Sequence, residues 1–270
     1  MIDLELVNVC KTYQAVGREP VKALDNVSLT VPGGTISGLV GESGSGKTTF
    51  IRCVMGIEKP DSGSITYDGI DLTKPSRAQQ RRIHREIQLV FQDPTASLNP
   101  RMTAYQLISE GLVIHNLART EAEKKSKVIE LLEMVGLGER DLDRRPKSFS
   151  GGQRQRIAIA RALAVSPKLL VCDEPVSALD VSVQAQVLNV LHDMQEELGL
   201  TILFIAHDLA VVRQICSTVA VIKTGQIVER GPSEQVLAAP EHEYTKALVA
   251  AIPIPDPVIA RQRAAERVAG

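Results

Sequence analysis

The sequence predicts an α/β fold in which a helical lobe interrupts a core of strands and helices. Three observations support this prediction. Short apolar runs typical of strands alternate with stretches of helical spacing, and a glycine-rich turn joins one such strand to a helix. The strand pattern also stops between about residues 93 and 166 and then resumes. A chain of 270 residues suits one large domain with an inserted lobe better than two complete domains.

The first third of the chain holds most of the predicted strands. An alternating run over residues 4–9 and another over residues 27–31 predict half-buried strands, and a turn of Pro and two Gly follows the second. An apolar strand over residues 36–40 leads through the glycine-rich turn into a helix over residues 47–55. Further elements follow: a short hairpin-like strand at residues 65–67, a basic helix over residues 77–85 and a strand over residues 87–91.

Residues 93–166 form the predicted helical lobe. Thr120 and Glu123 have the spacing of a capping box, and apolar residues at helical spacing follow until Gly136 ends the run. Strands over residues 169–172, 201–206 and 219–222, with a helix over residues 183–198, complete the core. We therefore assign residues 1–92 and 167–235 to the core, 93–166 to the lobe and 236–270 to a C-terminal tail. The proline-containing end after Ala251 is expected to pack loosely.

Composition narrows the classes of function. The 31 basic and 32 acidic residues give a net charge of −1, which disfavours nucleic acid as the main partner. The most apolar stretch, residues 198–206, is far shorter than the roughly 20 residues of a membrane-spanning helix. The first residues are acidic, unlike a signal peptide, and the four cysteines form no Cys-x-x-Cys pair. We therefore expect free thiols and a cytosolic chain, unless a partner holds it at a membrane.

The glycine-rich turn has the pattern Gly-x-x-x-x-Gly-Lys-Ser/Thr between a strand and a helix, which is typical of a phosphate-binding loop. Its backbone N–H groups can converge on phosphate oxygens, Lys47 can reach the β- and γ-phosphates, and Thr48 can place its hydroxyl on Mg²⁺. The alternative is a chance match in a glycine-containing turn. The residues assigned to nucleotide binding here are Gly41, Glu42, Ser43, Gly44, Ser45, Gly46, Lys47, Thr48 and Thr49.

Two further patterns point to the same chemistry. Asp173 and Glu174 end a buried strand, where Asp173 can hold Mg²⁺ through a water and Glu174 can polarise the water that attacks the γ-phosphate. Residues 150–153, Ser-Gly-Gly-Gln, open a helix and so form a second anion-binding end. Each pattern alone is equally typical of a helix cap. A single chain does not ordinarily surround one triphosphate with two such ends.

These three motifs, in this order, resemble the ATP-binding subunit of an ATP-binding-cassette (ABC) transporter. The resemblance implies a P-loop NTPase (RecA-like) core with an antiparallel β-subdomain and an inserted α-helical subdomain. It also implies ATP and Mg²⁺ as ligands, and ATP hydrolysis coupled to transmembrane solute transport. Tyr13 matches the family's aromatic residue that stacks on adenine. Gln92 matches the glutamine that touches Mg²⁺ and faces the membrane partner, and His207 matches the histidine that contacts the γ-phosphate. Tyr13 as an ordinary strand residue and His207 as a structural residue are the alternatives.

The resemblance also assigns roles across a dimer of two cassettes. Ser150, Gly151, Gly152 and Gln153 then serve the nucleotide of the partner cassette, and Asp180 lies in the loop that crosses between the subunits. The expected catalytic residues are Lys47, Gln92, Glu174 and His207, and the expected metal ligands are Thr48, Gln92 and Asp173.

Residues 92–101 and 174–182 resemble the oligopeptide and dipeptide importer branch. Residues 242–245, His-Glu-Tyr-Thr, are similar to that branch's His-Pro-Tyr-Thr element, with Glu243 in place of proline. The branch implies two transmembrane permease subunits, a second ABC ATPase in a heterodimer, an indirect solute-binding protein and a position at the cytoplasmic face of the membrane. The same branch also serves nickel, glutathione and opine-like solutes.

Two other functions compete with this interpretation. A soluble ABC ATPase of DNA repair or of ribosomes typically carries a long coiled-coil insertion or a second cassette, and neither pattern is present here. An unrelated phosphate-loop kinase or GTPase leaves residues 150–153 and His207 unexplained, and the chain has no Asn-Lys-x-Asp guanine motif.

Overall fold

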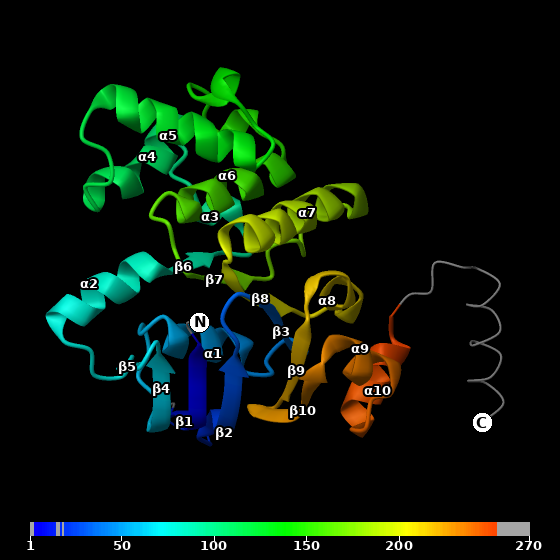
Figure 1. Cartoon of the computed structure of the whole chain (residues 1–270). Coiled ribbons are helices and arrows are strands. Elements are labelled where there is room, and N and C mark those ends of the chain that lie inside the picture. The colour runs from blue at the N-terminus through cyan, green and yellow to red at the C-terminus, as the bar shows by residue number, and fades with distance from the viewer. Residues whose placement is uncertain (1–2, 15–16, 18, 253–270) are drawn as a thin grey trace, which may run out of the picture.

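The computed structural model describes residues 3–14, 17 and 19–252, which form two β-sheets and a group of helices (Figure 1). The predicted loose end of the tail therefore lies almost wholly outside the described residues. The strands are β1 (Leu4–Tyr13), β2 (Val21–Val31), β3 (Ile36–Val40), β4 (Ser62–Tyr67), β5 (Ile70–Asp71), β6 (Ile87–Val90), β7 (Leu169–Asp173), β8 (Thr201–Ala206), β9 (Thr218–Lys223) and β10 (Gln226–Pro232). The helices are α1 (Lys47–Val54), α2 (Arg77–Glu86), α3 (Pro94–Ser97), α4 (Ala104–Ile114), α5 (Glu121–Met134), α6 (Gly151–Leu163), α7 (Val181–Leu198), α8 (Leu209–Ile215), α9 (Ser233–Ala238) and α10 (Glu243–Ala250), with short 3₁₀ turns at Glu139–Asp141 and Pro146–Ser148.

The larger sheet has the strand order β10-β9-β3-β8-β7-β6. The strands β9, β3, β8, β7 and β6 pair in parallel, and β10 adds an antiparallel edge strand. Parallel strands need crossover connections, and helices provide several of them. The structure therefore has the expected α/β core.

The two faces of this sheet form two separate hydrophobic cores. Along β8, Ile202 and Phe204 face the core shared with the helices α6, α7 and α8, whereas Leu203 and Ile205 face the opposite core. That second core is closed by α1 and by the antiparallel sheet β2-β1-β4-β5. The alternation is the two-residue period of a strand buried on both faces.

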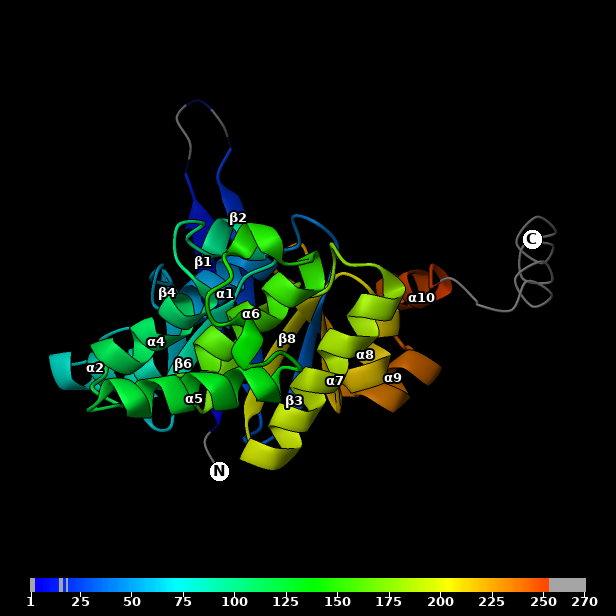
Figure 2. The same cartoon turned by 90° about the horizontal axis from the view of Figure 1, so that it is seen from above.

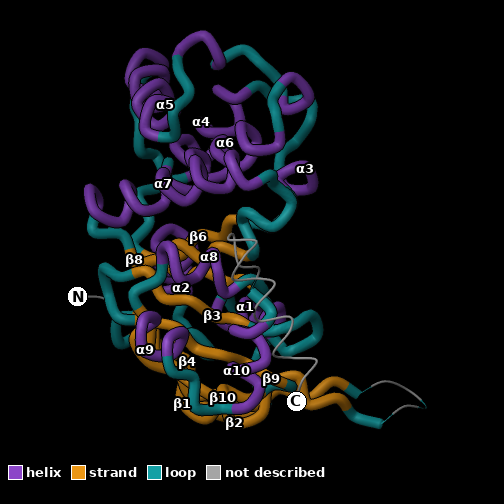
Figure 3. Tube along the Cα trace, turned by 90° about the vertical axis from the view of Figure 1, so that its right-hand side faces the viewer, coloured by secondary structure: helices purple, strands orange, loops and turns teal. Residues whose placement is uncertain are grey.

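The helices α4, α5 and α6 gather on one side of the molecule, with α7 between them and the core strands (Figure 3). From above, β1 and β2 extend past the other elements at one edge (Figure 2). Predicted elements are present throughout, but β5, β10, α8, α9 and α10 were not predicted from the sequence. The helix predicted over residues 183–198 begins two residues earlier, after Asp180, whose carboxylate caps it by accepting the N–H of Val183.

The predicted capping box at Thr120 is only half formed. The Thr120 hydroxyl accepts the N–H of Glu123, as expected, at 3.1 Å. The Glu123 carboxylate does not return to the N–H of Thr120 and instead accepts the N–H of Arg119 at 2.7 Å. The prediction of the reciprocal bond was therefore wrong by one residue, although the helix begins where expected.

Candidate functional site

Four predicted catalytic residues follow four neighbouring strands of the larger sheet. Lys47 opens α1 after β3, His207 follows β8, Glu174 follows β7, and Gln92 comes two residues after β6. These strands are adjacent and parallel in the order β3-β8-β7-β6, so their carboxyl ends meet at one edge. Ligand sites of open α/β sheets form at this edge. The topology thus brings together residues that lie up to 160 positions apart, from Lys47 to His207.

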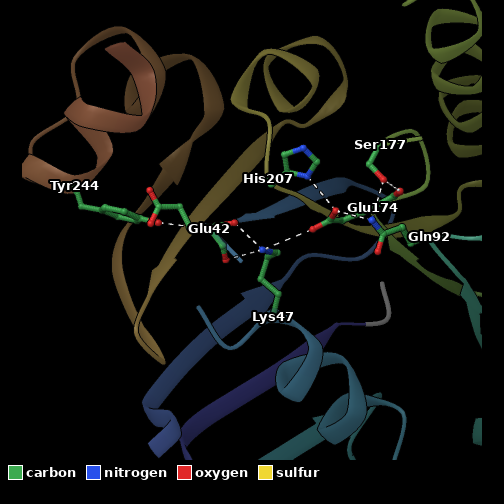
Figure 4. A network of polar contacts seen from close by, with 8 residues as sticks. Glu42, Lys47, Gln92, Glu174, Ser177, His207 and Tyr244 are labelled. Carbon is green, nitrogen blue, oxygen red and sulfur yellow. Dashed lines mark hydrogen bonds and ion pairs between the residues drawn. The ribbon is translucent and has the colours of Figure 1, made fainter. Parts of the chain in front are cut away.

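The side chains of these four residues form a connected polar network around Glu174 (Figure 4). One Glu174 oxygen lies 3.7 Å from Lys47 Nζ, and the other contacts His207 Nδ1 at 3.0 Å and Gln92 Nε2 at 3.2 Å. A carboxylate can only accept, so the contact with His207 requires a proton on Nδ1. The Glu174 backbone has a φ of 44°, in the left-handed region that a non-glycine residue rarely adopts. The backbone of Glu174 is therefore strained, and the network holds its carboxylate beside the phosphate loop.

Two backbone carbonyl groups of the phosphate loop accept hydrogen bonds from the Lys47 ammonium. Lys47 Nζ donates to the carbonyl of Gly41 at 2.6 Å and to that of Glu42 at 2.9 Å. Two glycines are required by close packing: a Cβ at Gly41 would lie 2.2 Å from the Ile222 carbonyl oxygen, and one at Gly46, with φ 110°, would lie 2.4 Å from that of Ala23. Both clashes are with backbone atoms, so this loop fits against its neighbours only without side chains at these positions.

The network borders a cleft of about 670 Å³. Most of the predicted nucleotide-binding, catalytic and metal-binding residues line this cleft: Tyr13, Glu42, Ser43, Gly44, Gly46, Lys47, Thr48, Thr49, Gln92, Asp173, Glu174 and His207. Gly41 and Ser45 belong to the same loop without lining the cleft. The hydroxyl of Ser45 is buried and has no hydrogen-bond partner among the described residues.

Asp173 provides a second carboxylate in the cleft. Burial raises the pKa of Asp173 above its ordinary value, and the negative charge of Glu174 adds to the effect, while Lys47 opposes it. A carboxylate held in this way gains from a nearby cation, and Thr48 and Gln92 place a hydroxyl and an amide in the same cleft. Oxygen donors of this kind suit Mg²⁺, which binds few protein ligands and keeps waters and phosphate oxygens. The residues present therefore fit the metal that the sequence predicts.

The second predicted anion site is separate from this cleft. Ser150 caps α6, because its hydroxyl accepts the N–H of Gln153 at 3.3 Å and the Gln153 side chain accepts the N–H of Ser150 at 3.0 Å. Gly152 and Gly151 pack near Val183 and Leu179, at the start of α7. Within this chain, residues 150–153 do not line the cleft of Lys47, and the role of Asp180 that the structure displays is to cap α7. Their predicted action on a partner's nucleotide stays a prediction.

The structure adds residues that sequence reasoning did not assign to the site. Val21, Lys22, Ala23 and Thr224 line the cleft. Ser177, within the stretch 174–182 that resembles the importer branch, accepts from Gln92 Nε2 at 3.1 Å and donates to the Glu174 carbonyl at 3.1 Å. No local pattern marks the first four, since their position depends on strand pairing.

Tyr244 on α10 also reaches the site, where its hydroxyl accepts the N–H of Glu42 at 3.1 Å (Figure 4). The His-Glu-Tyr-Thr element pointed to this residue without giving it a role. His242 of the same element is half-buried and caps α10.

Comparison with known proteins agrees with this geometry. Residues 24–177 match the family described as ABC transporter, and residues 228–269 match the C-terminal region of oligopeptide/dipeptide transporters. The chain is 48% identical over 260 residues to the oligopeptide transport ATP-binding protein OppF of Streptococcus mutans, covering 96% of this chain and 84% of that protein. It is also 48% identical over 262 residues to the dipeptide transport ATP-binding protein DppF of Lactococcus lactis, with the same coverage of 96% and 84%.

Solved structures show the same fold. A dimeric ATP-binding cassette in a post-hydrolysis state, bound to ADP and Pi, is 33% identical with a TM-score of 0.76, covering 85% of this chain and 98% of that one. The cbiO1 protein of Clostridium perfringens, part of an ABC transporter complex, is 32% identical with a TM-score of 0.77, covering 87% and 90%.

The chain therefore belongs to the ABC transporter family, as an ATPase cassette with a P-loop NTPase core. Within that family it belongs to the oligopeptide/dipeptide branch. These findings confirm the predicted family, fold class and ATPase class. They disfavour the soluble non-transport ATPase, and the unrelated kinase or GTPase is wrong. Among residues 3–14, 17 and 19–252, no helix is both long enough and apolar enough to cross a bilayer.

Proposed function

We propose that this protein is the peripheral ATPase subunit of an importer for oligopeptides or dipeptides, held at the cytoplasmic face of the membrane by permease subunits. The observation that carries the proposal is the convergence of Lys47, Glu174, His207 and Gln92 at one sheet edge beside a phosphate loop. The names of two similar relatives, an oligopeptide and a dipeptide transport ATP-binding protein, support peptides as the cargo class.

In the proposed reaction, Lys47 leaves the carbonyl groups of Gly41 and Glu42 and binds the β- and γ-phosphates of ATP. Because Lys47 also lies beside Glu174, its departure leaves that carboxylate with His207 and Gln92 as partners. Glu174 then accepts a proton from the attacking water, and His207 orients the carboxylate and contacts the γ-phosphate. Tyr13 lines the outer part of the cleft, where it can stack on adenine.

Mg²⁺ would neutralise charge on the phosphates during transfer. Thr48, Gln92 and Asp173 are the residues that would hold it, the first through its hydroxyl and the last through its carboxylate. The raised pKa of Asp173 supports this role, because a cation beside a buried carboxylate offsets the cost of its charge.

The second anion-binding end supports a closed dimer of two cassettes. Ser150 and Gly151 lie outside the cleft of their own chain, so they are available to a nucleotide held by a partner. A heterodimer with a second ATPase of the same branch is the proposed assembly, with ATP shifting the population toward the closed state.

An apolar groove beside Gln92 is the proposed docking surface for a permease subunit. The groove has a volume of about 440 Å³ and lies between the core and the helical lobe. Its lining includes Ile57, Phe91 and Ile114, which are 68%, 45% and 67% exposed. Large apolar side chains exposed side by side are typical of protein interaction sites. Phe91 is adjacent in sequence to Gln92, so docking here would reach the catalytic network directly.

The proposal is tested by purifying tagged Glu174→Gln protein from native membranes with MgATP and identifying what co-purifies. We expect two permease chains and a second, similar ATPase, because loss of the base leaves ATP bound and the dimer closed. Recovery of ribosomal or DNA-repair proteins alone would contradict the transport function. It would leave the ATPase chemistry intact.

The groove is tested in the same experiment with Ile114→Asp. This variant should lose the permease chains while it still binds ATP. Leu198→Asp is the matched control, because Leu198 is also a large exposed apolar residue, at 53%, and lies at the end of α7 outside the groove. Equal recovery of permease with both variants would argue against docking at the groove.

A further inference from the structure

The peptide unit between Gly41 and Glu42 is held from both sides. Its carbonyl oxygen accepts from Lys47 Nζ at 2.6 Å, and its N–H donates to the Tyr244 hydroxyl at 3.1 Å. The C=O and N–H of a trans peptide point in opposite directions. The phosphate-loop lysine and a tyrosine of the C-terminal region therefore fix the plane of the same peptide.

The Tyr244 ring is itself held in place. It is 8% exposed, and Lys223 Nζ lies 4.9 Å from the ring centroid, within the range of a cation–π contact. Burial raises the pKa of the Tyr244 phenol; the hydrogen bond from the Glu42 N–H works against this, and the charge of Glu42 adds to it. The hydroxyl thus stays neutral near pH 7 and accepts the N–H without adding a charge to the loop.

The start of α10 is anchored to the core sheet. Glu229 on β10 accepts the backbone N–H groups of Glu241 and His242 at 2.8 and 3.1 Å. His242 then caps the helix, because its Nδ1 accepts the N–H of Tyr244 at 3.0 Å. A continuous set of hydrogen bonds therefore leads from β10 through α10 to the phosphate loop.

A second contact joins the core sheet to the loop. The N–H of Gly225, in the turn between β9 and β10, donates to the carbonyl of Ser45 at 2.8 Å. The loop is thus held at Glu42 by Tyr244 of the C-terminal tail and at Ser45 by the turn between β9 and β10.

We propose that Tyr244 is a positioning residue of the nucleotide site, whose hydroxyl orders the Gly41–Glu42 peptide so that the loop receives ATP without rearranging. This inference rests on the proposed binding of ATP in the cleft. Without the hydroxyl, the Gly41–Glu42 peptide can rotate, and nucleotide binding must first order the loop. Affinity falls in proportion to the fraction of molecules with an ordered loop. The C-terminal region thereby sets the affinity of a site made by the core.

The test compares the wild-type full chain with Tyr244→Phe, which removes only the hydroxyl. Dissociation constants for MgATP are measured by calorimetry, and kcat and KM in the assembled transporter. Loss of one neutral hydrogen bond should raise the dissociation constant and KM about two- to tenfold. The value of kcat should change by less than about twofold, because the Tyr244 hydroxyl bonds to the Glu42 backbone and not to the side chains of Glu174, His207 or Gln92. A merely structural defect would lower kcat and the melting temperature as well.

Tyr105→Phe is the matched control, because the Tyr105 hydroxyl also makes one side-chain hydrogen bond, to Glu121 in the helical lobe. It should bind MgATP as the wild type does. Equal losses with Tyr244→Phe and Tyr105→Phe, or no loss with either, would overturn the positioning role. If the wild type itself fails to bind MgATP, the proposed function fails instead, and the two failures are therefore distinguishable.

Glu229→Gln provides a test that leaves Tyr244 in place. It weakens the anchor of α10, because an amide presents one acceptor oxygen where the carboxylate presents two. The variant should weaken MgATP binding in the same direction. In the double variant with Tyr244→Phe, Glu229→Gln should reduce MgATP affinity by less than it does alone, because both substitutions act through the same contact. Fully additive losses would show that α10 and Tyr244 do not act through the same peptide.

Discussion

The two glycines that open α6 should respond very differently to substitution by alanine. A Cβ on Gly152 would lie 2.0 Å from Val183 Cγ1, whereas one on Gly151 would lie 3.3 Å from Leu179 Cδ2. Carbon atoms in good contact are about 3.5–4.0 Å apart, so Gly152→Ala must push α6 and α7 apart by more than an ångström or force Val183 out of its rotamer. Gly151→Ala needs a shift of only a few tenths of an ångström at the end of a leucine.

The expected magnitudes follow from these gaps. Overpacking costs about 1–3 kcal/mol, and a clash this close belongs near the upper end. Replacing a helical glycine with alanine raises the free energy of unfolding by about 1 kcal/mol. The net effect of Gly152→Ala is therefore a loss of about 2 kcal/mol in the free energy of unfolding. That loss corresponds to a fall in melting temperature of about 4–8 °C. Gly151→Ala should stay within about 2 °C of the wild type, because its helix-propensity gain offsets a mild contact.

Thermal unfolding followed by circular dichroism measures both variants, and Val183→Ala supplies the rescue. The double variant Gly152→Ala/Val183→Ala should recover most of the lost stability, because the clashing methyl group is gone. The reasoning is refuted if Gly152→Ala unfolds at the wild-type temperature, or if removal of the Val183 methyl groups restores nothing. Since Gly151→Ala stays folded, its ATPase activity then reports on the predicted contact with the partner's nucleotide.

Three further outcomes are expected. Asp173→Asn should raise the melting temperature at pH 7. Folding raises the pKa of Asp173 from its ordinary 3.8, so the wild type loses stability as the pH rises through the folded pKa. The difference in melting temperature between the two proteins should vanish below the unfolded pKa, and a less stable variant at pH 7 would contradict this reasoning. Lys47→Ala should lower the steady-state ATPase rate at least about 100-fold, because it removes a charge aimed at the transferred phosphate, and wild-type turnover would disprove the phosphate-loop role. Thr120→Ala should cost about 1 kcal/mol in chemical denaturation by removing the cap of α5, whereas an unchanged midpoint would show that the cap is not needed.

The predicted catalytic residues could be placed together from sequence because each follows a strand. Lys47, Glu174 and His207 come after apolar runs, and parallel strands separated by helices present their carboxyl ends on one side. The residue patterns predicted Lys47 and Glu174 and the family resemblance predicted His207, whereas the strand order of the structure brings them to one sheet edge.

Other features lay beyond sequence reasoning for physical reasons. The strand β10 is mostly exposed or half-buried, so it lacks the apolar alternation that marks a strand. The N–H groups of Arg119 and Thr120 both precede the hydrogen-bonded turns of α5, and residue spacing does not decide which of them Glu123 accepts. Tyr244 reaches Glu42 only through the packing of α10 on the core, which no local pattern describes.

The contact between Tyr244 and Glu42 also determines when the cleft is completed during synthesis. The two residues lie 202 positions apart, so at about 5–20 residues per second the tyrosine leaves the ribosome roughly 10–40 s after the loop it supports. Until then the nascent chain holds β3, the phosphate loop and α1 without the hydroxyl that fixes the Gly41–Glu42 peptide. The nucleotide site is thus finished last, although its defining motif is among the first segments made. Premature termination between residues 226 and 243 would yield a chain with every predicted catalytic side chain but without the hydrogen bond at the Glu42 N–H.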